Sequence, residues 1–344
     1  MTSERKYKYD LTSVVGAALA LATVQAATAD TTDLEAVTVY ARRLVPLSRV
    51  AAAVSVIPQE TIERTLSADV KELVRYEPGL SVRSDPFRFG VDTFAVRGVG
   101  GNRVSVEVDG IPAAGGFAIG AYSDSGRRFV DLTFVERVEV LRGPASSLYG
   151  SDAIGGVVAM TTVKPGSLLD GDADAAARFE SGYASKDDGW HASLVGAARL
   201  GPAEALLGYV RREGQASGTA ADVTPNPRDY GADSLLGRIV LPGAPGGPLT
   251  LTAEAGRIQQ DTSVDALLGT PPRFVNTTLL LGDDRSERFR VDIGQQLDRT
   301  AWFDSADWRL YWQGTDTEQR SFERRRAVPP RTPPLQIERE FRIE

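Results

Sequence analysis

The side chains that could carry out chemistry are few in this sequence of 344 residues. Histidine occurs once, at His191, and cysteine does not occur. A single histidine cannot form an HExxH or two-histidine metal site, and a cysteine nucleophile is excluded. The net charge of -7 gives no basic surface for nucleic acid. We therefore expect no catalytic site, no metal, no cofactor and no nucleic-acid partner.

The N-terminus has the order of a bacterial secretory signal. Three basic residues among the first eight precede an apolar stretch at 14–22, and small residues follow at 26–29. The apolar stretch is shorter than the ~20 residues that a membrane helix needs, which argues against an uncleaved anchor. We expect residues 1–29 to be removed as a signal peptide and the chain to be exported through the periplasm.

From residue 175 onward the sequence alternates between apolar and polar residues, which is typical of membrane barrel strands. In 190–200, 249–255 and 308–312 every second residue is apolar, and polar residues such as His191, Ser193 and Arg199 fall between them. Side chains of a strand alternate between two faces, so we expect one face in lipid and the other in a wet lumen. A soluble β-sandwich would alternate as well and is the alternative.

The connections between these strands also alternate. Those at 201–202 and 242–248 are short, whereas 212–230 and 259–288 are long and polar. This is the pattern of periplasmic turns and external loops. We expect about seven strands and the start of an eighth near Gln336, against the ~22 of plugged transporter barrels.

Residues 52–165 have a different, mixed texture. The sequence predicts a strand at 54–57 and a helix with Val70, Leu73 and Val74 on one face. Alternation at 104–108 and 138–141 predicts two half-buried strands. This part should form an α+β domain.

Two blocks in this domain carry a resemblance. Residues 139–158 resemble the plug signature of TonB-dependent outer-membrane receptors, and residues 96–112 resemble the matching plug element, closest to the haemoglobin/haem (haemoglobin/transferrin/lactoferrin) receptor branch. The resemblance implies an α+β plug domain at 46–166, followed at 175–344 by a partial antiparallel transmembrane β-barrel. The chain then looks like the N-terminal fragment of an outer-membrane receptor.

A short extended stretch lies between the signal and the plug, within 30–45. Its β-branched residues could be captured as a strand by another protein's sheet. The resemblance implies that it contains the TonB box, which pairs with TonB, itself energised by ExbB and ExbD. A plain linker is the alternative. The TonB box would consist of Leu34, Glu35, Ala36, Val37, Thr38, Val39 and Tyr40.

The resemblance also implies roles for four further residues. Arg97 and Arg142, each followed by glycine, would pair with lumenal glutamates and lock the plug, because arginine forms bidentate pairs with carboxylates. Surface arginines are the alternative. His191, on the predicted lumenal face, and Tyr122, in a glycine-rich segment, are candidate ligand contacts, since haem iron accepts both residue types. For His191, the alternative is an ordinary polar residue in a polar lumen.

The function expected from these observations is energy-coupled import of haem or another iron complex, with the ligand transported and not held as a cofactor. The ligand could be haem, a haemoprotein or a siderophore; a siderophore or other chelate receptor is the alternative. The other two alternatives are a truncated inactive receptor and a soluble plug-like binding or signalling module. Because a partial barrel leaves unpaired strand edges in lipid, these 344 residues alone are not expected to insert as a working transporter.

Overall fold

In the computed structural model residues 32–344 form one compact unit. The predicted signal peptide, most of the predicted TonB box and Tyr122 lie outside the residues that the structure describes. The described residues are 36–37, 45–46, 52–67, 69–85, 88, 90–119, 123–125, 130–169, 171–215, 226–297, 302–303, 305–327 and 334–343.

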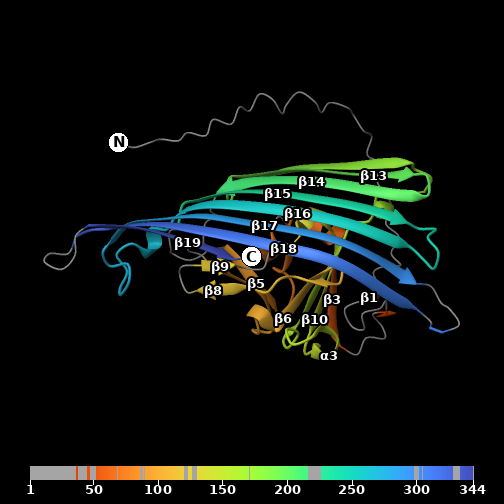
Figure 1. Ribbon diagram of the computed structural model, residues 1–344, viewed down its shortest axis with the longest axis horizontal. Helices are drawn as coiled ribbons and strands as arrows, with labels where there is room; N and C mark the ends of the chain where they lie inside the picture. The colour runs from red at the N-terminus through yellow and green to blue at the C-terminus, as the bar shows by residue number, and fades with distance from the viewer. Residues whose placement is uncertain are drawn as a thin grey trace, which may run out of the picture. The chain divides into compact units, whose positions relative to one another are not determined.

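The C-terminal part is one antiparallel sheet of eight long strands, called the wall below. The strands lie side by side in chain order, each paired with its sequence neighbours (Figure 1). This confirms the predicted antiparallel strand set. The strands are β12 (Ala175–Ala184), β13 (Gly189–Leu200), β14 (Ala203–Gln215), β15 (Arg228–Leu241), β16 (Leu249–Ser263), β17 (Thr277–Leu297), β18 (Ala306–Arg325) and β19 (Leu335–Ile343).

The predicted alternation of faces is confirmed in β13 and β16, whereas residues 307–312 of β18 are exposed on both faces. On β13, Trp190 and Leu194 are 42% and 54% exposed, whereas Ser193 and Val195 are buried. The burial pattern of β16 alternates over 251–255 in the same way. The face that carries Trp190 and Leu194 is called the outer face below, and the opposite one the inner face.

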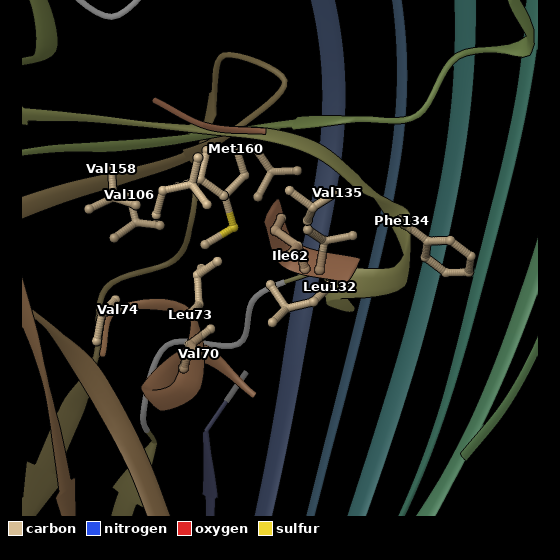
Figure 2. Packing of buried hydrophobic residues seen from close by; sticks show 14 of the residues in the cluster. Ile62, Val70, Leu73, Val74, Val106, Leu132, Phe134, Val135, Val158 and Met160 are labelled. Atoms are coloured by element: carbon tan, nitrogen blue, oxygen red, sulfur yellow. The ribbon is translucent and has the colours of Figure 1, made fainter. Parts of the chain in front are cut away.

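The inner face is not uniformly wet, and this part of the prediction was wrong. Apolar side chains on the inner face of β13 to β15 belong to the main hydrophobic core, together with Phe134 of the N-terminal domain. Figure 2 shows the Phe134 ring directed toward neighbouring strands. An apolar side chain from the other domain excludes water here. The wall residues are Val195, Leu206, Val210 and Leu236.

The two long connections are shorter than predicted, because the strands continue further. The connections run over 216–227 and 264–276, and β17 already begins at Thr277. Beyond the apolar part of the wall both faces of a strand carry charged side chains, as at Asp284 and Arg285, so the two-residue period disappears from the sequence. Segment 264–276 has its own small apolar cluster around Phe274.

The N-terminal domain, residues 52–169, is built on a five-stranded mixed sheet. Its strand order is β3-β10-β11-β6-β7, and only β11 and β6 are parallel. The sheet strands are β3 (Ala53–Pro58), β6 (Val104–Val108), β7 (Ile111–Pro112), β10 (Val135–Arg142) and β11 (Gly156–Thr162). Three small two-stranded pairs lie outside it: β1 (Ala36–Val37) with β2 (Val45–Pro46), β4 (Leu80–Asp85) with β5 (Gly90–Val96), and β8 (Phe117–Ile119) with β9 (Ser123–Ser125).

Short helices complete the domain. Asp69 caps the helix α2 by accepting a hydrogen bond from the Glu72 amide at 2.9 Å, and Val70 and Leu73 turn into the core (Figure 2). The predicted strand at 54–57 and helix around 70–74 are thereby confirmed. Among the described residues, no helix is long and apolar enough to cross a membrane. The helices are α1 (Gln59–Arg64), α2 (Val70–Leu73) and α3 (Ser146–Tyr149), with 3₁₀ turns at Gly101–Arg103, Leu132–Phe134, Pro165–Ser167 and Asp265–Leu267.

The central strands of this sheet are more buried than their alternation predicts. Every residue of β6 is buried, including Ser105 and Glu107. Apolar clusters lie on both faces of the sheet: Val106 belongs to one and Leu141 to the other. The residues of a strand that lies between two packed faces are buried whatever their polarity, so the alternation in the sequence underestimated their burial.

The paired glycines of the plug-like motif are required by close packing. A Cβ atom on Gly156, whose φ is +157°, would lie 2.4 Å from the Leu141 carbonyl oxygen. We expect Gly156→Ala to destabilise the domain by about 3 kcal/mol, from overpacking and backbone strain. Hydrogen exchange of β10 and β11 measures this. Gly150→Ala is the control: φ is +81° but no atom lies within 4 Å, so about 1 kcal/mol is expected. Equal losses in both variants would contradict the packing argument.

Candidate functional site

The densest polar contact between the N-terminal domain and the wall is centred on Asp109, in the turn between β6 and β7. Its carboxylate accepts hydrogen bonds from the Thr162 amide at 2.9 Å and hydroxyl at 2.7 Å. From the wall, Arg238 and Arg290 each donate to the same oxygen, Oδ2, at 2.9 Å. All three charged side chains are at most 8% exposed. We call this contact the Asp109 anchor.

Backbone carbonyl groups of the N-terminal domain extend the anchor. Arg290 donates to the Val108 carbonyl at 2.8 Å, and Arg238 donates to those of Thr162 and Val163 at 3.0 and 2.9 Å. Arginine suits this position because its planar fork of five donors can serve a carboxylate and carbonyls together. The anchor therefore fixes the β6–β7 corner and the end of β11 to β15 and β17.

The wall supplies carboxylates that balance the buried arginines. Glu254 of β16 lies 3.1 Å from Arg290 and 3.4 Å from Arg288, and Asp292 lies 3.5 Å from Arg290. Arg288, Arg290 and Asp292 occupy every second position of β17 and so share its inner face. With Asp109, the cluster pairs three carboxylates with three arginines, which is how buried charge is tolerated.

The electrostatics keep Asp109 ionised. Burial alone would raise the pKa of its carboxyl group, but Arg238, Arg290 and the Thr162 hydrogen bonds hold that pKa well below the ordinary value of 3.8. A carboxyl group with a lowered pKa in the folded state contributes stability that is present above the ordinary value and is lost as the pH falls below it.

Anchoring should therefore be insensitive to pH over the neutral range. We expect the protection of β6 and β7 amides, corrected for intrinsic exchange rates, to be unchanged from about pH 8 to about pH 5 and to fall only on further acidification. Hydrogen exchange at a series of pH values measures this. A loss of protection between pH 8 and pH 5 would show that another group controls the contact.

A second anchor joins Arg88 to β17 and β18. Arg88 forms a bidentate pair with Asp284, at 2.8 and 2.6 Å, and also donates to the Ser321 hydroxyl at 2.6 Å. Arg88 and Asp284 are almost fully buried. Paired donors of this kind add geometric specificity to charge attraction, so this anchor fixes the orientation of Arg88 against the wall.

A third anchor joins Asp131 to Arg212 of β14. Arg212 donates to both carboxylate oxygens, at 2.6 and 2.8 Å, and to the Thr133 hydroxyl at 3.0 Å. Burial acts to raise the pKa of Asp131, but Arg212 and the hydrogen bonds from Thr133 lower it overall.

The helices α1 and α2 of the N-terminal domain contact the wall through ion pairs that are partly exposed to solvent. Arg178 of β12 lies 2.7 Å from Glu63 of α1, and Lys186 pairs with Glu72 of α2. These side chains are 26% to 46% exposed, so the pairs contribute little to stability. Among the described residues, every buried ion pair between the N-terminal domain and the wall involves a domain residue that lies C-terminal to β4.

The predicted site residues are placed as follows. Arg142 donates to Glu77 at 2.8 Å, inside the N-terminal domain, and Arg97 is exposed. Within the described part of the chain neither is bonded to the wall, so their pairing with barrel glutamates stays a prediction. His191 lies on the inner side of β13, 3.4 Å from Glu180, with its ring over Gly182. Of the predicted TonB box, only the β1 backbone is described.

The three anchors were not predicted from the sequence. Asp109, which has a φ of +53° in its Asp-Gly turn, lies in no sequence pattern that identifies it as an anchor. The available signal was arginine at alternating inner positions of a barrel strand, as at Arg288 and Arg290 of β17. Among the described residues, no group of three histidine, cysteine, aspartate or glutamate side chains could hold a metal ion.

Comparison with known proteins places these features in a family. Residues 46–157 match the model of the TonB-dependent receptor plug domain. The chain is 30% identical over 161 residues to transferrin-binding protein A of Haemophilus influenzae, covering 44% of this chain and 18% of that protein. It is 34% identical over 120 residues to the vitamin B12 transporter BtuB of Vibrio vulnificus, covering 34% of this chain and 18% of that protein.

A solved structure resembles the chain over both of its parts. The haemophore receptor HasR of Serratia marcescens, in a complex with its haemophore HasA and haem, matches with a TM-score of 0.60 at 15% identity. The match covers 80% of this chain and 39% of HasR. The chain thus spans about a fifth of the curated relatives and two fifths of HasR.

The plug match, the homologous receptors and the partial barrel fold agree. Residues 46–157 are a plug domain, and the wall corresponds to the first strands of the surrounding barrel. Members of this group are receptors and transporters of the outer membrane and not enzymes. The chain carries the plug domain of the TonB-dependent receptor family.

Proposed function

We propose that this chain forms the plug and the first barrel strands of a receptor that imports haem or another iron complex across the outer membrane. It acts by binding and conformational change, without catalysing a reaction. The observation that carries the proposal is the set of three buried arginine–carboxylate anchors, which hold a plug against the inner face of a barrel wall. A domain fixed in this way closes a pore and must be rearranged before a ligand can pass.

In this proposal, TonB supplies the energy for that rearrangement and is itself energised by ExbB and ExbD. Leu34–Tyr40 form the TonB box, which adds a strand to a sheet of TonB. Ala36–Val37 already pair with Val45–Pro46 as β1 and β2, which supports an extended backbone at this position. Ligand binding would favour a state in which this stretch is free to pair, and it can do so only if the ligand binds the two states with different affinity.

Haem is the first candidate substrate. The named ligands of the related proteins include transferrin, vitamin B12 and, for HasR, a haemophore with haem. His191 and Tyr122 are proposed as ligand contacts, because both residue types can coordinate haem iron. Import of a siderophore or another chelate is the second candidate function, and the plug and wall serve it equally well. Arg97 and Arg142 are proposed to lock the plug to later barrel strands.

Growth under iron limitation tests the function and separates the two substrates. A strain without the receptor gene is supplied with haem or with a ferric siderophore as the only iron source, with and without the wild-type gene. The proposal predicts that the gene restores growth on haem and that removal of TonB abolishes it. Growth restored by a siderophore alone would support the chelate alternative. Restoration by neither would leave the inactive receptor or a soluble plug-like module.

A further inference from the structure

The inner face of the wall carries a group of arginines at the end where the long connections lie. Arg325 of β18 donates to both carboxylate oxygens of Glu323, at 2.7 and 3.2 Å, and Arg339 of β19 donates to one of them at 3.1 Å. The Thr277 hydroxyl donates to the same carboxylate at 2.6 Å. Glu323 is fully buried, whereas Arg325 and Arg339 are 30% and 23% exposed. The two arginines therefore lie between a buried carboxylate and open space.

The connection 264–276 brings a third arginine to this place. Phe274 packs against Leu280 on the inner face of β17, and Leu280 lies directly opposite Glu323 on β18. The guanidinium group of Arg273 lies over the Phe274 ring, 4.8 Å from its centre. The connection thus folds inward over the end of the wall and places Arg273 near Glu323. With the two arginines described above, Arg273 and Glu323 form what we call the mouth cluster.

Positive charge predominates in the mouth cluster, because three arginines share it with one carboxylate. The cross-strand neighbours of its strand residues on the same face are uncharged. Arg88 of the plug also reaches this face, through the Ser321 hydroxyl, but it forms a bidentate pair with Asp284. The neighbours are Leu280 and Ile337 for Glu323, Thr277 and Leu335 for Arg325, and Ser321 for Arg339.

The electrostatics of Arg273 agree with this balance of charge. Burial lowers the pKa of its guanidinium group, and the positive charges of Arg339 and Arg325 lower it further, against the opposing effect of Glu323. A cation whose pKa is lowered by neighbouring cations lies in a positive potential. An anion that entered the cluster would relieve this repulsion.

We propose that the mouth cluster binds a carboxylate group of the imported iron complex, either a propionate of haem or a carboxylate of an iron chelate. This inference rests on the proposed function and names the chemical class that the ligand carries. Arg325 and Arg339 already hold the carboxylate of Glu323, so arginine forks at this place have the geometry that such a group requires. Long connections of an outer-membrane barrel lie outside the cell, so the ligand meets this cluster as it enters.

The alternative is a structural role, in which the cluster only fastens the connection 264–276 to the ends of β17 and β18. The two roles differ in how binding depends on the carboxylates of the ligand. A structural role affects ligands with and without carboxylates equally. A carboxylate site affects only the former, and replacing its internal competitor by Glu323→Gln should favour them further. Glutamine keeps the shape of the side chain, and Arg273 lies outside the strands, so folding should be preserved in Glu323→Gln and Arg273→Gln.

The test measures binding to the receptor purified from outer membranes, by quenching of tryptophan fluorescence. Haem is compared with haem dimethyl ester, in which both propionates are blocked, and ferric citrate with ferrichrome, which has no carboxylate. We expect about tenfold tighter binding of the carboxylate form in one of the two pairs, which identifies the source of the carboxylate. Arg273→Gln should lose most of that preference, and Glu323→Gln should increase it several-fold.

Arg324→Gln is the matched control for the loss of an arginine. Arg324 is the neighbour of Arg325 but is exposed on the opposite face of β18, where its guanidinium group lies 5.9 Å from the centre of the Phe322 ring. The variant should keep the wild-type preference. An equal loss of preference in Arg324→Gln and Arg273→Gln would show that general surface charge, and not the mouth cluster, attracts the ligand.

Three further results would overturn the inference. The first is tight binding of iron complexes without a preference for carboxylates in either pair, which would leave the proposed import function standing. The second is an unchanged preference in Arg273→Gln, and the third is a reduced preference in Glu323→Gln, which would identify a structural cluster. Failure of the wild-type receptor to bind any of the four complexes would instead remove the proposed function together with the inference.

Discussion

Asp109→Asn is expected to loosen the plug from the wall by about 3 to 5 kcal/mol, because it leaves two buried arginines without their shared carboxylate. Arg238 and Arg290 both donate to Oδ2 of Asp109, and both are almost fully buried. The amide of asparagine keeps the shape of the side chain and removes its charge. Hydrogen exchange should accelerate in β6, β7 and the end of β11. Cells carrying the variant should also become sensitive to large antibiotics that a closed plug excludes.

Glu60→Gln is the matched control for this change. Glu60 lies in α1 of the same domain and is exposed. Loss of charge at an exposed position should change stability by no more than about 0.5 kcal/mol. If Asp109→Asn exchanged no faster than Glu60→Gln in β6 and β7, the Asp109 anchor would not hold the plug.

Val37→Pro is expected to reduce import to the level of a strain without the receptor while leaving ligand binding intact. Strand addition relies on main-chain hydrogen bonds, and proline has no N–H to donate. Val37 lies in β1, within the proposed TonB box. Uptake of the ligand and its binding to whole cells are measured in parallel, so that energy coupling is separated from recognition.

Val37→Thr provides the control for the TonB box. Threonine is β-branched like valine, keeps the backbone N–H and is equally compatible with a strand. Import should remain near the wild-type rate. Normal uptake by Val37→Pro would exclude strand pairing through this residue, whereas loss of uptake in both variants would point to a role of the side chain.

The sequence was informative wherever a short-range pattern determines structure. Alternation identified the outer face at 190–200 and 249–255, because the side-chain period of a strand is fixed by the backbone. The motif at 139–158, which spans the end of β10, α3 and the start of β11, identified the plug domain. Close local packing explains the glycines of this motif, because a side chain on Gly156 would collide with the neighbouring strand.

The anchors could not be predicted because they join residues far apart in the chain. Asp109 meets Arg290 across 181 positions, and Arg88 meets Asp284 across 196. Nothing in the local sequence of either partner identifies the other. The dry contact of Phe134 with the wall has the same origin, since it depends on how two domains pack. Gly208 illustrates this: a Cβ there would lie 2.6 Å from the Phe134 ring, yet its sequence neighbours give no hint of that contact.

The measurement that tests the central claim most directly is uptake of iron-55 from labelled haem by iron-starved cells, with and without the receptor gene and with and without an uncoupler of the inner-membrane proton gradient. The account predicts uptake that requires both the receptor and the gradient, with surface binding of haem surviving the uncoupler. Receptor-dependent uptake that continues at full rate after uncoupling would contradict energy-coupled import by a plugged barrel.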